Sequence, residues 1–226
     1  MEGYPVVIAI KLVSIAAIAY LCGAVPFGLI ISRRMAGIDI RKYGSGNIGA
    51  TNVFRVLGAK SGLITLVLDL AKSAIPVLLS MLIMDKEIIY ILGYDIHMQV
   101  AQILAAIMAM VGHNWSAYIG FKGGKGVATF FGGLVVINWM VALIALIAAV
   151  IVVLITRYVS LGSMVASLGA LLAFAAMAVL AVTAPVYLLY GLVAAALIIY
   201  QHRSNIMRLQ AGTESKIGDK SARVRS

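Results

Sequence analysis

The sequence is dominated by long apolar runs that short, mostly basic segments interrupt. Residues 5–31 and 62–84 are two such runs, each long enough to cross a ~30 Å hydrocarbon layer as a helix that rises about 1.5 Å per residue. Hydrophobic residues make up 63% of the 226 residues and charged residues only 12%. Because a chain in lipid must satisfy its backbone hydrogen bonds internally, continuous apolar runs favour helices. The sequence therefore predicts an all-α, polytopic integral membrane protein.

Seven apolar segments are candidate membrane-spanning helices. They are residues 5–31, 62–84, 98–112, 126–137, 139–156, 164–181 and 186–200. Pro26 and Gly28 predict a kink near the end of the first segment, and Asn138 marks a turn between the two middle helices. Residues 126–137 reach only about 18 Å as a helix, so a longer hydropathy window merges them with the next segment and gives a different count.

The basic residues determine the predicted orientation. Fifteen of the 18 Lys and Arg residues lie in residues 32–60, 122–125 and 201–226 or at Arg157, and these segments alternate consistently with the apolar runs. Because basic loops stay on the cytoplasmic side, we expect the N-terminus outside and the C-terminus inside. The net charge of +10 then reflects topology and attraction for anionic lipids and substrates, with no pattern that indicates nucleic-acid binding.

These features predict one membrane domain over residues 1–226. Residues 217–226 are polar, and we expect them to form a flexible cytoplasmic tail. No basic segment precedes the first apolar run, so that run is expected to be retained rather than cleaved as a signal. Cys22 is the only cysteine, which excludes an intrachain disulfide.

Two glycine-rich polar segments are candidates for holding phosphate. In the first, residues 44–58, glycines allow close backbone approach to a ligand and Arg55 offers a planar cationic fork. The same segment supplies Ser45, Gly46, Asn47, Thr51 and Asn52 as further candidate donors. The second segment places Gly123, Gly124, Lys125 and Gly126 at the start of an apolar helix, where backbone N–H groups favour anions.

Neither segment is a nucleotide-binding motif. Residues 44–49 match GxGxxG, but no buried strand precedes them, and the acidic residue twenty positions on, Asp69, lies in an apolar helix. Residues 120–126 have one residue too few for a Walker loop, and Gly126 replaces the Ser or Thr that would hold magnesium.

Other chemistry-bearing residues are sparse. Asp69 and Lys72 lie three residues apart in an apolar helix, where they share a face and can pair; both a functional site and a structural ion pair remain open. The histidines have no metal-like spacing, and the sequence contains no GxSxG element. If the protein transfers acyl groups, its donor must already be reactive.

Three stretches together resemble the bacterial acyl-phosphate:glycerol-3-phosphate acyltransferases, the PlsY family. They are GSGNIGATNVFRVLG (44–58), GHNWSAYIGFKGGKGVAT (112–129) and HRSNIMRLQAGTESKIG (202–218), in the family's order. The resemblance runs from about residue 4 to residue 218. One departure is Ser73, which follows Lys72 where the family often has glycine.

The resemblance implies an enzyme of the bacterial inner membrane whose three motifs meet at the cytoplasmic face. It implies glycerol 3-phosphate, acyl phosphate and membrane lipid as partners, and no metal or cofactor. The products would be 1-acyl-glycerol 3-phosphate and phosphate, in the first step of phospholipid synthesis. The oligomeric state is left open.

Family roles can be carried over to matching residues. The resemblance implies catalytic or phosphate-orienting roles for Ser45, Arg55 and Lys125, and a catalytic pair at His202 and Asn205. It implies substrate binding by the glycine loop 123–126 and, more weakly, by Ser163, and a structural role for Glu214.

Two functions of other classes compete with this interpretation. An anion transporter would use the basic loops as gates, but transporters place polar groups near the midplane and often have repeated halves. A scaffold protein would leave the glycine and cation segments unexplained.

The charge pattern generates a testable topology. Single cysteines placed in residues 40–60, 116–125 and 201–218 of a Cys22→Ala chain should all resist an impermeant thiol reagent added outside intact cells. A control cysteine near position 87 should be labelled. Labelling of any of the three inner segments would contradict the predicted orientation.

Overall fold

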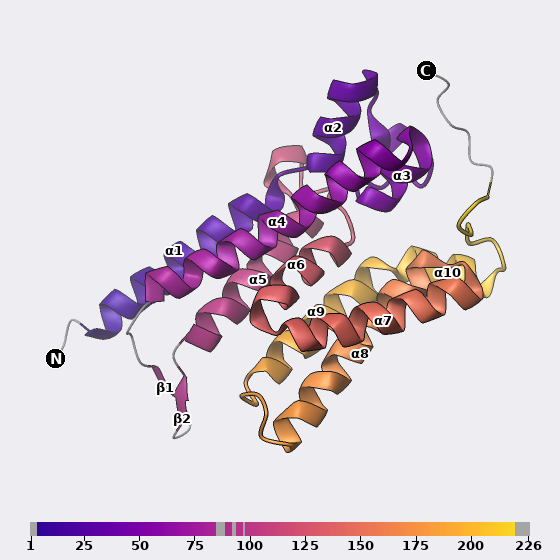
Figure 1. Ribbon diagram of the computed structural model, residues 1–226. Helices are drawn as coiled ribbons and strands as arrows, with labels where there is room; N and C mark the ends of the chain where they lie inside the picture. Colours follow the sequence, from indigo (N-terminus) through magenta and orange to yellow (C-terminus); the bar gives the residue numbers. More distant parts are fainter. Residues whose placement is uncertain (1–3, 85–88, 92–93, 97, 220–226) are drawn as a thin grey trace.

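Each of the seven predicted apolar segments is helical, and the first is divided between two helices. The computed structural model describes residues 4–84, 89–91, 94–96 and 98–219. Its α-helices are α1 (Tyr4–Ala24), α2 (Phe27–Ala36), α3 (Ala50–Leu57), α4 (Ala59–Met84), α5 (Met98–Asn114), α6 (Val127–Ile137), α7 (Trp139–Thr156), α8 (Val159–Val179), α9 (Tyr187–Gln201) and α10 (Arg203–Gln210), shown in Figure 1. Two single 3₁₀ turns, η1 (Ile40–Lys42) and η2 (Ala117–Ile119), lie in the polar segments.

Five of the helical segments in the described part are long and apolar enough to cross a membrane. Helices α6 and α9 are shorter, with 11 and 15 residues. The predicted turn at Asn138 is confirmed: its side chain accepts a hydrogen bond from the N–H of Val141 (3.1 Å) and so caps α7. The count of seven spans and the orientation stay predictions.

The all-α fold class is confirmed, and the described residues depart from it only in one short hairpin. Strands β1 (Ile89–Ile91) and β2 (Tyr94–Ile96) form an antiparallel hairpin in which Ile89 is opposite Ile96. The β-branched and aromatic residues of this segment favour strands.

The first basic segment is also more structured than a loop. Within it α3 packs Val53 and Val56 against Leu29, Ile40 and Ile48, which gives the segment a small core of its own. Apolar residues three apart in a helix lie on one face, so this helix could have been read from the sequence.

Pro26 breaks the first apolar run between α1 and α2, as predicted. Non-helical backbone at this depth needs partners from elsewhere in the protein. The Ser116 hydroxyl donates to the carbonyl of Ala24 (2.5 Å), and the Lys72 ammonium donates to the carbonyl of Val25 (2.9 Å). Lys72 is itself paired with Asp69 (2.8 Å), and both side chains are almost fully buried. The predicted pairing of Asp69 with Lys72 is confirmed. Lys72 also stabilises the backbone at the break between α1 and α2.

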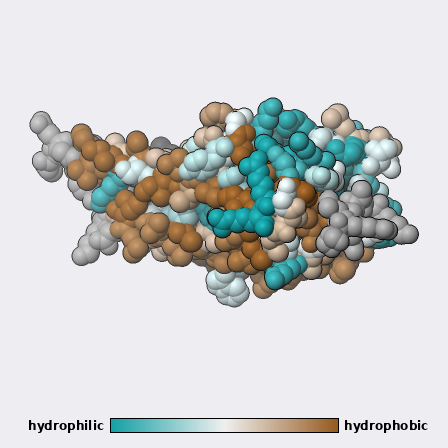
Figure 2. All heavy atoms as spheres, turned by 90° about the horizontal axis from the view of Figure 1, so that it is seen from above, coloured by the Kyte–Doolittle hydropathy of each residue, from teal (hydrophilic) through white to brown (hydrophobic). Residues whose placement is uncertain are grey.

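The helices form two groups (Figure 1). One contains α1, α4, α5 and α6, and the other contains α7, α8, α9 and α10. Helix α9 joins them, because the Tyr190 hydroxyl donates to the carbonyl of Phe130 on α6 (2.9 Å) and the Tyr187 hydroxyl bonds Gln102 on α5 (2.6 Å). Hydrophilic side chains gather over one end of the visible face in Figure 2, and apolar ones cover the other. The chain thus separates a polar end from an apolar body.

The buried pair predicts a stability effect. Lys72→Met should lower the free energy of unfolding by about 3–5 kcal/mol, because it leaves a buried carboxylate without its partner. The double change Asp69→Leu with Lys72→Met should recover much of that loss. Thermal unfolding in detergent checks both, with Lys60→Met, an exposed position on the same helix, as the matched control. A single variant that is no less stable than the control would contradict the structural role of Lys72.

Candidate functional site

A cavity of about 820 Å³ lies at the polar end and collects residues from all three motifs. Among the predicted site residues, those that line it are Ser45, Asn47, Thr51, Asn52, Arg55, Asp69, Lys125, Gly126, Ser163, His202, Asn205 and Glu214. An adjoining pocket of about 410 Å³ adds Gly46, Gly123 and Gly124 and shares Ser45, Asn47 and Lys125. Of the predicted residues, Lys72 is outside both lining sets. Folding therefore brings together segments up to about 170 residues apart in the sequence.

The Asn205 side chain links the second motif to the third. Its amide oxygen accepts a hydrogen bond from the Lys125 ammonium (2.5 Å), and its amide nitrogen donates to Glu214 Oε1 (2.6 Å). Lysine can only donate and an ionised carboxylate can only accept, so these two neighbours fix which way the amide points. Glu214 therefore fixes the Asn205 side chain, and Asn205 in turn fixes the Lys125 ammonium.

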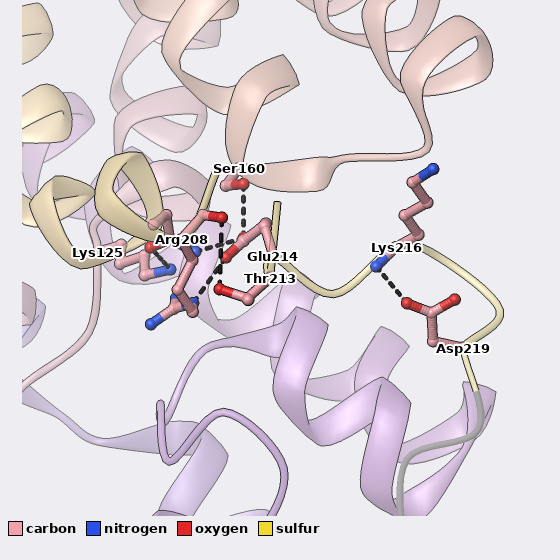
Figure 3. Close-up of polar contacts among 8 residues, drawn as sticks. Lys125, Ser160, Arg208, Thr213, Glu214, Lys216 and Asp219 are labelled. Carbon is pink, nitrogen blue, oxygen red and sulfur yellow. Dashed lines mark hydrogen bonds and ion pairs between the residues drawn. The ribbon is translucent and has the colours of Figure 1, made fainter. Parts of the chain in front are cut away.

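Glu214 is held from three sides (Figure 3). Besides Asn205, it accepts hydrogen bonds from the Ser160 hydroxyl (2.7 Å) and from Arg208 Nε (2.8 Å). Burial opposes ionisation of this carboxyl, but the three donors together with the charge of Arg208 outweigh it, and the pKa of Glu214 is lowered. The carboxylate is therefore a fixed anion that organises the groups around it.

The side chain of Lys125 has a perturbed pKa. Burial lowers its pKa to about 8, and the nearby cations Arg208 and Arg55 act in the same direction, while Glu214 acts against them. An additional anion in the cavity would favour the charged form of this cluster. The arrangement is thus suited to binding a phosphate group.

His202 has one ring nitrogen committed to the backbone. Its Nδ1 lies 2.8 Å from the carbonyl of Ile198, which requires the proton on Nδ1 and leaves Nε2 as an acceptor in the neutral ring. Burial, followed by the charge of Lys125, lowers the pKa of His202 to about 4. At neutral pH this residue is therefore an uncharged hydrogen-bond acceptor.

Asn52, a predicted donor to phosphate, is hydrogen-bonded within the first glycine-rich loop. Its amide nitrogen donates to the carbonyls of Tyr43 (3.0 Å) and Asn47 (2.8 Å), and its oxygen accepts from the N–H of Ser45 (2.8 Å). A Cβ at Gly44, which has φ +58°, would lie only 2.3 Å from that oxygen. Asn52 therefore shapes the first loop and holds the backbone of Ser45 in place.

The glycine loop at residues 123–126, which is expected to bind substrate, packs against α5. The N–H groups of Gly123 and Gly124 donate to the carbonyls of Asn114 (3.1 Å) and His113 (3.0 Å) at the end of α5. A Cβ at Gly124 would lie 2.1 Å from the ring nitrogen Nε2 of His113. These glycines allow the loop to lie against α5, and the loop in turn positions Lys125.

Helix α6 begins directly after Gly126, as predicted. Gly126 caps the helix with φ +78°, a conformation that favours glycine. The N-terminal end of α6 is thus part of the cavity wall, since Gly126 and Val127 both line it. This end contributes a partial positive charge beside Lys125.

Sequence reasoning missed two residues of the Glu214 cluster. Arg208 follows Asn205 by three positions on α10, so helical spacing could have indicated it. Ser160 had no such signal: the corner after Arg157 pointed to Ser163 instead, whose hydroxyl donates to the carbonyl of Val159 (2.8 Å).

The cavity has an apolar arm. Leu66 and Leu70 of α4, Phe131 and Val135 of α6 and Leu146 of α7 line it. Leu66, Val135 and Leu146 are also partly exposed on the outside of the molecule. The same cavity is thus lined by polar and by apolar side chains, and three of the apolar ones are also exposed on the outside. No cluster of three or more potential metal-ligating residues occurs in the part of the chain that the structure describes.

A polar, cation-rich cavity at one end of a bundle of apolar helices is an arrangement suited to a membrane enzyme. The family model for glycerol-3-phosphate acyltransferase matches residues 13–212. A glycerol-3-phosphate acyltransferase of Clostridioides difficile is 41% identical over 91% of this chain and 95% of its own. One of Dehalococcoides mccartyi is 35% identical over 93% of this chain and 98% of its own.

Two solved structures are also similar to this chain. The glycerol 3-phosphate form of PlsY, an integral membrane glycerol 3-phosphate acyltransferase, superposes with a TM-score of 0.78 at 37% identity, over 92% of this chain and 96% of that one. Its lysophosphatidic acid form gives a TM-score of 0.76 at 36% identity. The chain belongs to the glycerol-3-phosphate acyltransferase family, PlsY, and is a multi-pass membrane acyltransferase. The transporter and scaffold alternatives are set aside.

The lowered pKa of Lys125 predicts the pH dependence of activity. The residue is a cation below pH 8 and neutral above it, so the catalytic efficiency kcat/KM of acyl transfer should fall as the pH rises through about 8. The loss should approach tenfold per unit, about 1.4 kcal/mol each. Lys125→Arg should abolish this fall in kcat/KM at high pH, because arginine stays charged. A wild-type profile that stays flat to high pH would contradict a role for the Lys125 charge.

Proposed function

We propose that the protein transfers an acyl chain from an acyl phosphate to the 1-hydroxyl of glycerol 3-phosphate. The products are 1-acyl-glycerol 3-phosphate and phosphate. The observation that carries the proposal is one cavity in which Arg55, Lys125 and Arg208 adjoin an apolar arm. Two phosphate groups and one acyl chain require this combination. The glycerol 3-phosphate and lysophosphatidic acid forms of the solved relatives support the same acceptor and product.

The acyl chain and the phosphate groups bind at different ends of the cavity. The acyl chain lies along the apolar arm between α4, α6 and α7, where it can enter from the lipid. Its phosphate and glycerol 3-phosphate lie at the polar end, where both carry negative charge. Such positioning with charge neutralisation is the main contribution that this protein makes to the reaction.

The polar residues have distinct roles. Arg55 offers bidentate contact to a phosphoryl group, and Lys125 supplies a second cation. Ser45, Gly46, Asn47, Thr51 and Ser163 line the cavity or its adjoining pocket and orient the phosphates. His202 accepts a hydrogen bond from the glycerol end through Nε2, beside Asn205 on the same helical turn.

The transfer is direct and substrate-assisted. The oxygen of the 1-hydroxyl attacks the acyl carbon, the bond from that carbon to the phosphate oxygen breaks, and phosphate leaves. With a pKa of about 4, His202 is a poor proton acceptor. A phosphate monoester has a second pKa of about 6 and is the better base, so the hydroxyl proton passes to a phosphate oxygen. No cofactor or metal takes part in this scheme.

We place the reaction at the cytoplasmic face of the bacterial inner membrane, in a single domain with seven spans. The support is the positive charge of the segments that form the site and their position at the hydrophilic end (Figure 2). Acyl phosphate then reaches the site from the inner leaflet and glycerol 3-phosphate from the cytoplasm, as in the first step of phospholipid synthesis.

Purified protein in lipid tests the proposal. Labelled acyl phosphate with glycerol 3-phosphate should give labelled 1-acyl-glycerol 3-phosphate, acyl-coenzyme A should give none, and chelators should leave the rate unchanged. Incubation with acyl phosphate alone should leave no acyl group on the denatured protein. A stable acyl group at Ser45 together with ping-pong kinetics would contradict direct transfer and make Ser45 a nucleophile.

A further inference from the structure

The segment after α10 crosses back over the site as a strap (residues 211–219). Gly212, with φ +69°, and a hydrogen bond from the N–H of Thr213 to the carbonyl of Arg208 (2.8 Å) reverse the chain at the end of α10. This reversal brings Glu214 back to Arg208 and Asn205 (Figure 3). The strap therefore supplies the carboxylate on which the Asn205 contact depends.

The other end of the strap is fastened to the corner between α7 and α8. Arg157 donates to the carbonyl of Ile217 through both Nε (3.1 Å) and Nη2 (2.5 Å), and its own carbonyl accepts the N–H of Ile217 (2.8 Å). We call these three hydrogen bonds the clasp. Beside them the Lys216 ammonium lies 5.3 Å from the centre of the Tyr158 ring. Ile217, the first residue of the segment expected to form a flexible tail, thus takes part in the clasp, while residues 220–226 lie outside the described residues.

Arg157 occupies a conformation that glycine would normally fill. It ends α7 with φ 63° and ψ 10°, in the left-handed region that residues with a side chain rarely adopt. Strain of this kind persists where surrounding contacts fix the residue. On the strap, Gly218 has φ +88° and lies so close that a Cβ would be 3.0 Å from the Arg157 guanidinium. Arg157 and Gly218 thus both adopt a positive φ where the two segments meet at the clasp.

The clasp and the Glu214 cluster share one corner. Ser160, which donates to Glu214, follows Arg157 by three residues in the first turn of α8. Glu214 is thus flanked by the chain reversal at α10 on one side and by the clasp on the other. Without the clasp, the strap would keep the contacts of Glu214, the chain reversal and the contact of Lys216 with Tyr158, but would lose its hydrogen bonds to Arg157.

We propose that Arg157 is a positioning residue for acyl transfer. The guanidinium holds the strap so that Glu214 orients Asn205, and Asn205 in turn orients Lys125. Arg157 lines neither cavity, so its effect passes through Glu214. This inference rests on the proposed function.

Steady-state kinetics of Arg157→Ala and Arg157→Lys test the proposal. Arg157→Ala should lower kcat about tenfold, equivalent to about 1.4 kcal/mol, with KM for glycerol 3-phosphate changed far less. Arg157→Lys should recover only part of the loss, because an ammonium lacks the two-pronged donor geometry. Lys60→Ala, another exposed cation at the polar end, is the matched control and should keep wild-type kinetics.

A double-mutant cycle shows whether the effect passes through Glu214. If it does, Arg157→Ala combined with Glu214→Ala should be no slower than Glu214→Ala alone. Fully additive losses, or an Arg157→Ala enzyme with wild-type kcat, would overturn the proposal.

Limited trypsin digestion in lipid nanodiscs reports on the strap without using activity. Cleavage after Lys216 should be faster in Arg157→Ala than in wild type or Lys60→Ala. Equal cleavage rates would overturn the proposal. If the wild type transferred no acyl group from acyl phosphate, the proposed function would fail, whereas faster cleavage of the variant would still establish the clasp.

Discussion

The contact on which the site depends is the bridge that Asn205 forms between Lys125 and Glu214. The two charged groups come from segments almost 90 residues apart, and one amide connects them. A half-buried lysine and carboxylate are costly to desolvate unless each finds a well-aligned partner. Asn205 provides this partner to both and leaves the lysine available to a ligand. The same amide therefore stabilises the folded site and prepares it for an anion.

The membrane imposes a second constraint, which explains why polar side chains are buried at the break between α1 and α2. Where Pro26 interrupts the helix, backbone carbonyls would lack partners in lipid. Ser116 and Lys72 supply them, and Asp69 balances the charge of Lys72. These residues fix α2 and, through it, the small core under the first loop. A break in one helix is thus tied to the placement of Ser45 and Arg55.

Several features followed from the sequence because they depend on local pattern. Continuous apolar runs specify helices, Asn138 specifies a turn with its own cap, and Asp69 with Lys72 are three residues apart and so share a face. The small helix α3 could also have been predicted from Val53 and Val56. The pairing of β1 with β2 was missed because a short apolar stretch between spans resembles a loop.

The sequence by itself determined the class of the protein, the helical segments and the residue types available for phosphate, since these depend on composition and spacing. Only the tertiary structure decided what each residue touches. It assigned Asn52 to the loop backbone, set Gly123 and Gly124 against α5, and joined Ser160 and Arg208 to Glu214. These outcomes depend on contacts between residues far apart in the chain, and a single sequence carries no record of which distant groups meet. Burial then set the pKa of Lys125 and of His202, a property that exists only once the cavity has formed.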